Sequence, residues 1–340
     1  MTYQIRVAQS DIEFGCDEGT TILEAARKSG YELPYSCRTG ICGSCKGHLV
    51  SGSVDMPGAS EALSAEERDA GYTLFCQARP TSDVEIGARS ITRLDPNAHQ
   101  TVDAKIYKLT RVTDDVTVLQ LRFPAGKRVR FKAGQYLQVL LPDGSRRSYS
   151  MANPPHQNDG VQLHIRHLPG GRFSGYLEST AAAGDIVRVE MPFGDFFLRD
   201  NTDNADKPLV FVASGTGFAP IKSILEDMFK RGAPQRPVTL YWGARRKADL
   251  YQPELPEKWA RQYPGFRFVQ VLSEEDDGAS RTGLVHRAVV EDFPTLAGHD
   301  VYACGVPAMI TAARKDFTGQ CGLPADAFYC DAFVTEAAQD

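Results

Sequence analysis

Four of the eight cysteines in this 340-residue chain have the most restrictive spacing in the sequence. Cys37, Cys42 and Cys45 lie in one short loop, and Cys76 follows thirty-one positions after Cys45. A disulfide framework would spread its cysteines more evenly and would need an oxidising compartment. Thiolates gathered in one loop are typical of metal ligands. The spacing therefore predicts that these four cysteines hold a metal centre.

The order C-x4-C-x2-C…C is the ligand spacing of plant-type [2Fe–2S] ferredoxins. Gly40, Gly43 and Ser44 are small, so backbone N–H groups can approach the cluster and hydrogen-bond to its sulfur atoms. The alternative is a tetrahedral zinc site, but zinc ligands usually come as two compact pairs. We therefore expect a [2Fe–2S] cluster on the four cysteines, and hence a protein that transfers electrons.

The segment around these cysteines predicts a small α+β domain over residues 1–93. Strand-like runs flank a helix in TILEAARKSG, where Thr20 or Thr21 is the expected N-cap and Gly30 the expected stop. A polar stretch over residues 94–102 predicts a linker.

The remaining chain contains two segments with different secondary-structure patterns. Residues 103–204 contain short alternating strands separated by turn signals such as PDG and PGG, which favours an antiparallel barrel or sandwich. Residues 205–340 alternate apolar strands with amphipathic helices in PIKSILEDMFKRG and PAMITAARKDFTGQ, which indicates a doubly wound α/β domain.

Charge and hydropathy exclude several classes of function. The net charge of −5 gives no sign of nucleic-acid binding, and no apolar run reaches the roughly 18 residues of a membrane span. Without a signal-peptide pattern, we expect a cytoplasmic protein. A monomer is the default expectation for its oligomeric state. Residues 1–93 carry 9 Lys and Arg against 13 Asp and Glu. This acidic segment could steer a basic redox partner, or it could simply be a soluble surface.

The β-rich segment contains residues that suit a flavin dinucleotide. Its rings need an aromatic wall and a hydrogen-bond partner, which Tyr149 and Ser150 can supply. Its pyrophosphate needs cations and N–H groups, which Arg147, Arg166 and the turn with Gly170, Gly171 and Ser174 can supply. Taken singly, these residues are better explained by a core tyrosine and a plain turn.

In the third segment, the buried strand PLVFVAS runs into Gly215-Thr216-Gly217 and then a helix. A glycine turn between a strand and a helix N-terminus is a phosphate-binding arrangement, although a tight turn alone would look the same. Two other strand ends, at Trp242-Gly243-Ala244-Arg245 and at Cys304-Gly305, are expected at the same edge of the sheet, where ligands bind.

In their order, the motifs R-x-Y-S-x-A, P-G-G-x-x-S, G-T-G-x-A-P, W-G-A-R and C-G-x-P-A-M resemble the iron–sulfur flavoprotein reductases of bacterial oxygenase systems. The resemblance covers essentially the whole chain. It implies a plant-type ferredoxin with a β-grasp fold, an antiparallel β-barrel that binds FAD, and a Rossmann-like domain that binds NADH. By motif, the implied flavin-binding residues are Tyr136, Arg147, Tyr149, Ser150, His164, Ile165, Arg166, Gly170, Gly171 and Ser174. The implied nicotinamide-side residues are Gly215, Thr216, Gly217, Pro220, Gly243, Arg245, Cys304, Gly305 and Phe333.

The resemblance also implies roles at the reacting rings for Ser150, Cys304 and Phe333, with Phe333 stacked on the flavin. Electrons would pass from NADH to FAD, then to the cluster, and finally to a terminal dioxygenase of Rieske type, for aromatic rings such as the dicarboxylate terephthalate. Other acceptors are a monooxygenase or a sugar-deoxygenating dehydratase, and a redox sensor without turnover is a third possibility. NADH is favoured over NADPH because the acidic run from Glu274 to Asp277 would repel a 2′-phosphate, although Arg245, Arg246, Lys247 and Arg281 lie nearby in sequence.

Overall fold

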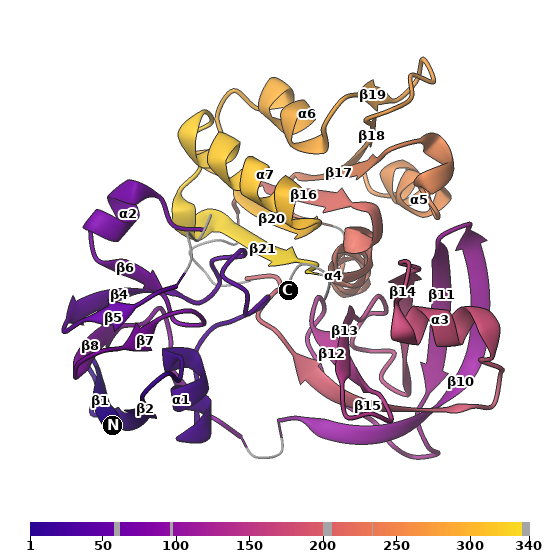
Figure 1. Cartoon of the computed structure of the whole chain (residues 1–340). Coiled ribbons are helices and arrows are strands. Elements are labelled where there is room, and N and C mark those ends of the chain that lie inside the picture. Colours follow the sequence, from indigo (N-terminus) through magenta and orange to yellow (C-terminus); the bar gives the residue numbers. More distant parts are fainter. Residues whose placement is uncertain (58–61, 96–97, 200–205, 233, 335–340) are drawn as a thin grey trace. The chain divides into compact units, whose positions relative to one another are not determined.

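The computed structural model describes residues 1–57, 62–95, 98–199, 206–232 and 234–334 (Figure 1). The chain divides into two compact units, Met1–Ala98 with Cys330–Asp340, and His99–Tyr329. Parts of the predicted linker and of the predicted domain ends, at residues 96–97, 200–205 and 335–340, lie outside the described residues. Among the described residues, no helix has the length and apolar character that crossing a bilayer requires.

The first unit is built on a five-stranded mixed sheet with the order β2-β1-β8-β4-β6, in which β1 and β8 are parallel. This is the predicted β-grasp fold. Its strands are β1 Thr2–Val7, β2 Glu13–Asp17, β3 Tyr31–Glu32, β4 Lys46–Ser51, β5 Val54–Asp55, β6 Tyr72–Leu74, β7 Arg79–Pro80, β8 Val84–Gly87 and β9 Thr92–Arg93. Its helices are α1 Ile22–Lys28 and α2 Ala65–Asp69.

Helix α1 begins where the sequence predicted. Thr21 is the N-cap, and its hydroxyl accepts a hydrogen bond from Glu24 N at 3.3 Å while Glu24 reaches back to Thr21 N. The helix ends at Lys28, and Gly30 follows with a φ of 80°, a left-handed conformation that suits glycine. The apolar face of α1 packs with Ile5 and Leu74 in the core of this unit.

The second unit begins with a six-stranded antiparallel sheet in the order β13-β12-β15-β10-β11-β14. An antiparallel bridge between Met151 and Leu163 joins its two end strands, so the sheet closes into the predicted barrel. The elements are β10 Gln100–Thr113, β11 Val116–Arg122, β12 Tyr136–Leu140, β13 Arg146–Ser150, β14 Gly160–Arg166, α3 Arg172–Ser179 and β15 Ile186–Phe193.

The rest of the second unit is the predicted doubly wound α/β domain. Strands β18, β17, β16 and β20 are neighbours in that order and run parallel. Figure 1 shows α6 and α7 side by side on one face of this sheet. The elements are β16 Leu209–Ser214, α4 Phe218–Arg231, β17 Val238–Ala244, α5 Glu254–Gln262, β18 Phe266–Leu272, β19 Arg281–Thr282, α6 Val285–Asp292, β20 Asp300–Gly305 and α7 Pro307–Gly319, with short 3₁₀ turns at Gly215–Gly217, Lys247–Asp249 and Ala325–Ala327. The last strand, β21 Phe328–Ala332, begins in the second unit, and its residues from Cys330 onward are counted with the first.

The four strands with continuous apolar runs and the two amphipathic helices confirm the sequence prediction. The predicted elements did not include the helices α2, α3, α5 and α6 or the strands β4, β13 and β21. A signal for α2 was present, because Ser64 and Glu67 form a capping box with the spacing S-x-x-E. Helix α3 was read as a plain turn at PGG.

Candidate functional sites

The cysteine loop of the first unit holds sulfur atoms among backbone N–H groups. Cys37 Sγ accepts hydrogen bonds from Thr39 N at 3.4 Å and from Cys42 N at 3.3 Å. Cys42 Sγ accepts from Ser44 N at 3.5 Å. Gly40 and Gly43 have left-handed φ values of 82° and 70°, which let the loop turn so that these N–H groups point inward. These backbone N–H donors suit sulfur atoms that carry a negative charge.

Contacts between the thiols shift their pKa values in opposite directions. The Cys42 side chain hydrogen-bonds to Cys37 and lowers the pKa of Cys37, and Cys45 does the same for Cys76, whereas these contacts and burial raise the pKa of Cys42 and of Cys45. A thiolate is the form of cysteine that binds iron. The fourth cysteine, Cys76, follows β6, and Phe75 N donates to Cys45 O at 3.1 Å, which holds Cys76 beside the loop. The Gln77 side chain donates to Cys76 Sγ at 3.7 Å. The four residues therefore fit the predicted [2Fe–2S] cluster.

The two halves of the predicted flavin site meet at the barrel closure. Tyr149 and Ser150 end β13, and the Met151–Leu163 bridge puts them beside the end of β14. The Tyr149 ring packs against Phe173 at 5.6 Å between centroids, and Ser150 is buried. Tyr136 lies opposite Ser150 on β12 and is also buried.

The P-G-G-x-x-S motif forms the N-terminus of α3. Gly171 is the N-cap, and no side chain caps the helix there. The first-turn N–H groups of such a helix suit a phosphate. A Cβ on Gly171 would lie 2.3 Å from Ser174 Oγ and 3.0 Å from Leu168 O, so a side chain here would displace the Ser174 hydroxyl. Arg147, on β13, donates to Arg146 O at 3.0 Å.

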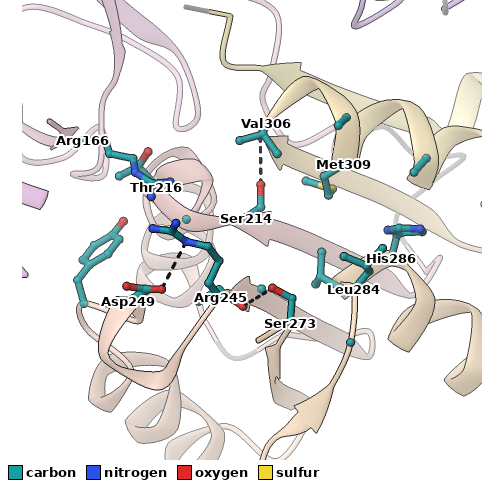
Figure 2. Close-up of a pocket in the computed structure, with 18 of the residues that line it drawn as sticks. Arg166, Ser214, Thr216, Arg245, Asp249, Ser273, Leu284, His286, Val306 and Met309 are labelled. Atoms are coloured by element: carbon teal, nitrogen blue, oxygen red, sulfur yellow. Dashed lines mark hydrogen bonds and ion pairs between the residues drawn. The ribbon is translucent and has the colours of Figure 1, made fainter. Parts of the chain in front are cut away.

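A cavity of about 410 Å³ opens at the carboxyl edge of the parallel sheet. Gly215 and Thr216 line it after β16, Gly243 and Arg245 at the end of β17, and Val306 after β20 (Figure 2). The strand ends that the sequence predicted to meet do meet here. A pocket that contains a glycine turn at a helix N-terminus suits a dinucleotide.

Two glycines allow the strands to approach each other under this cavity. A Cβ on Gly217 would lie 2.1 Å from Cys304 O, and one on Gly305 would lie 2.0 Å from Ser214 Oγ. Ser214 Oγ in turn accepts a hydrogen bond from Val306 N at 3.1 Å. These glycines therefore position the phosphate turn against β20.

Some predicted residues lie elsewhere than on the cavity wall. Cys304 is fully buried, and Val306 lines the cavity at its strand end. Pro220 is buried in the first turn of α4, and Ile165 is buried in the barrel core. Phe333 follows β21 and is half-buried, so its stacking role stays a prediction.

The cations near the cavity are paired with carboxylates. Arg245 forms an ion pair with Asp249 at 3.9 Å, as Figure 2 shows. Lys247 Nζ pairs with Asp277 at 2.8 Å, and that contact is the main reason why the pKa of Lys247 is raised. Glu275 accepts a hydrogen bond from Lys247 N at 2.7 Å. The acidic run from Glu274 to Asp277 therefore partly neutralises the positive charge of Lys247.

Several cavity residues belong to none of the predicted site motifs, and five of them have polar side chains. They come from turns and helix starts that fold against the strand ends. The residues are Asp115, Asp249, Tyr251, Ser273 and His286.

Three protein-family models match successive parts of the chain. The model of the 2Fe-2S iron-sulfur cluster binding domain matches residues 5–81, which decides between a cluster and zinc. The model of the oxidoreductase FAD-binding domain matches residues 103–198. The model of the oxidoreductase NAD-binding domain matches residues 211–315. The cofactors of the chain are therefore a [2Fe–2S] cluster, FAD and NADH.

Relatives match nearly the full length. The chain is 43% identical to terephthalate 1,2-dioxygenase reductase component 2 of Comamonas sp, over 98% of both proteins. It is 38% identical to CDP-6-deoxy-L-threo-D-glycero-4-hexulose-3-dehydrase reductase of Yersinia pseudotuberculosis, over 98% of this chain and 99% of that protein. Its structure matches the Amycolatopsis cytochrome P450 reductase GcoB with a TM-score of 0.74 and 37% identity, over 98% of this chain and 99% of that one. The chain belongs to the family of NADH-dependent iron–sulfur flavoprotein reductases.

Proposed function

We propose that the chain is the reductase component of a multicomponent oxygenase, supplying electrons from NADH to a terminal oxygenase of Rieske type. The observation that carries this proposal is the 43% identity, over 98% of both chains, to a terephthalate 1,2-dioxygenase reductase component. The same relative supports an aromatic dicarboxylate such as terephthalate as the oxygenase's substrate. A cytoplasmic location is supported by the four cluster cysteines, because thiols must stay reduced in order to bind iron.

The residues of each site suit one part of this task. When bound, FAD supplies the conversion between hydride transfer and the transfer of single electrons. Tyr149 would stack on its rings, Ser150 would hydrogen-bond at its reactive edge, and the α3 N-terminus would bind its pyrophosphate. The Gly215–Thr216 turn would orient NADH, while the apolar wall with Val306 and Met309 excludes water.

We also propose a strong preference for NADH over NADPH. A 2′-phosphate binds where basic side chains are available to it. Here Arg245 faces Asp249, and Lys247 is held by Asp277. Arg281 is bonded to Asp292 and Glu291. These carboxylates and the acidic run from Glu274 to Asp277 would repel a 2′-phosphate placed beside these cations.

A second acceptor is supported by a second relative. The 38% identity to a dehydrase reductase of Yersinia pseudotuberculosis favours a sugar dehydratase as the alternative. Purified chain should support turnover of an aromatic-dicarboxylate dioxygenase with NADH. If it drives only the dehydratase, the electron relay stands and the oxygenase assignment fails.

The relay itself is tested by Cys42→Ser. Losing one thiolate should abolish cluster binding, which is visible in the absorbance and in the electron paramagnetic resonance of the reduced protein. We expect NADH-dependent reduction of cytochrome c to be lost, while ferricyanide reduction, which the FAD site alone supports, is largely kept. Equal loss of both activities in a variant that retains FAD would contradict the proposed order of electron transfer.

A further inference from the structure

The carboxylate of Asp115 lies at the cavity, although neither the motifs nor the proposed chemistry uses it. Asp115 is in the turn between β10 and β11 and lines the cavity wall. Its Oδ2 accepts a hydrogen bond from Arg166 Nε at 2.8 Å, and its Oδ1 accepts one from Thr113 Oγ1 at 3.0 Å. Its backbone carbonyl accepts from His167 N at 2.7 Å. The side chain is therefore held from two directions and pointed at Arg166.

Arg166 in turn belongs to the face of β14 that meets the α/β domain. His164 and Arg166 are two residues apart on a strand, so their side chains lie on one face. His164 Nδ1 shares a hydrogen bond of 2.9 Å with Tyr251 OH, and Tyr251 also lines the cavity. Arg166 itself lines the cavity beside Gly215 and Thr216. This face of β14 therefore contributes to the wall of the dinucleotide cavity and to its support.

The position of the guanidinium follows from its contact with Asp115. Because Asp115 binds Nε, the terminal Nη groups are left directed towards the phosphate turn. A Cβ built on Gly215 would lie 3.6 Å from Arg166 Nη1. Figure 2 shows the Arg166 side chain next to Thr216, and Arg245 also lines this cavity. Guanidinium groups bind phosphate oxygens through pairs of N–H donors, so their orientation matters as well as their charge.

We propose that Asp115 is a positioning residue for NADH binding: it orients Arg166 so that the guanidinium binds the pyrophosphate of NADH at the Gly215–Thr216 turn. This differs from the sequence expectation, which put Arg166 on the FAD pyrophosphate. The inference rests on the use of NADH by this family and is independent of the terminal acceptor. Asp115 and Arg166 are both about one-third exposed, with side-chain values of 33% and 35%, so an arriving anion can reach them.

The test is Asp115→Asn in the full-length protein loaded with FAD and cluster. Asparagine keeps the shape but loses the charge that holds Arg166. We expect the KM for NADH with ferricyanide, and the Kd of NAD+ measured by calorimetry, to rise about tenfold, the scale of one charge-assisted hydrogen bond. The kcat and the FAD content, read from flavin absorbance after denaturation, should be unchanged.

Two further variants make the result decisive. Asp114→Asn is the matched control, because Asp114 precedes Asp115 in the same turn and does not line the cavity. It should leave the affinity for NAD+ unchanged. Arg166→Gln should weaken NAD+ binding at full FAD content, and combining it with Asp115→Asn should add little more, because Asp115 acts through Arg166.

Three outcomes would overturn the proposal. If Arg166→Gln loses FAD while its affinity for NAD+ is unchanged, Arg166 binds the flavin and not NADH. Additive effects of the two substitutions would show that Asp115 does not act through Arg166. Unchanged affinity in Asp115→Asn would exclude the role altogether. If Asp115→Asn fails to fold, the affinity for NAD+ and the FAD content are measured on Arg166→Gln and Arg166→Lys instead. Failure of the whole relay would appear differently, as no NADH oxidation in the unmodified protein.

Discussion

At the scale of single residues, the sites depend on two kinds of position. At one kind there is no room for a Cβ, and at the other a polar side chain orients a second side chain through a hydrogen bond. Gly217 belongs to the first kind, because its missing Cβ lets the phosphate turn lie against β20. Asp115 belongs to the second kind, because it orients Arg166. Neither residue needs to react in order to control how the dinucleotide binds.

Replacing Gly217 by alanine should damage the dinucleotide site. The new Cβ would lie 2.1 Å from the Cys304 carbonyl oxygen, so the turn or the strand end must shift. We expect a loss of about 1–3 kcal/mol in the free energy of unfolding, typical of overpacking, and a raised KM for NADH. Urea unfolding and steady-state ferricyanide assays measure both.

Gly319→Ala is the matched control. Gly319 ends α7, and a Cβ there would meet nothing within 4 Å. This substitution should be neutral or slightly stabilising, since alanine has the higher helix propensity. Equal effects of the two substitutions would show that close packing at Gly217 is not the cause.

At the scale of elements, the carboxyl ends of β16, β17 and β20 form the cavity, and β14 of the barrel contributes its wall from the other side. The barrel and the α/β domain are joined by buried polar contacts. Lys222 Nζ donates to Ala152 O at 3.0 Å, and Ser223 Oγ donates to Asn153 O at 2.7 Å. The His164–Tyr251 bond lies between the same two parts. These contacts make the second unit sensitive to the protonation of its buried groups.

The second unit should lose stability on mild acidification. Burial, followed by the nearby positive charge of Lys222, lowers the pKa of His164 well below its usual value, and burial also lowers the pKa of His286 and of His299. The unfolded state therefore binds more protons below about pH 6.5, and the free energy of unfolding falls there by up to about 1.4 kcal/mol per pH unit for each histidine. Above that pH the histidine contribution is fully present.

Urea unfolding of the FAD-loaded protein at about pH 7.5 and pH 5.5 measures this dependence. His164→Gln should reduce the difference between the two pH values. His156→Gln, at an exposed position in the same barrel, should leave the difference as it is. A stability that stays level or rises on acidification would refute the prediction.

At the scale of the whole molecule, the two units divide the chemistry between them. The first unit contains the four cluster cysteines, which serve one-electron transfer, and the second contains the flavin motifs and the dinucleotide cavity. The net charge is divided as well, because residues 1–93 carry four more acidic than basic residues and the rest carries one more. A partner that takes electrons from the cluster would meet this acidic segment.

Electron transfer to a basic acceptor should therefore depend on salt. The kcat/KM for cytochrome c, a basic protein, should fall roughly tenfold as ionic strength rises from about 0.01 to 0.5 M, because screening removes the attraction. Stopped-flow and steady-state assays with saturating NADH measure it. Ferricyanide, a small anion, is the control and should show no such decrease. A rate with cytochrome c that is insensitive to salt would show that the acidic segment is merely a soluble surface.

Features that depend on a local pattern could be predicted from the residues alone. The cysteine spacing, the apolar strands, an N-cap at Thr20 or Thr21 and the glycine turn at Gly215 were predicted, because each needs only neighbouring residues or a fixed spacing. Tertiary structure alone decided which side chains line the cavity and which partners they have. Arg166 meets Asp115 across 51 positions of sequence, and His164 meets Tyr251 across 87. Such pairs form only when strands and turns from different parts of the chain pack together, so no local pattern contains them.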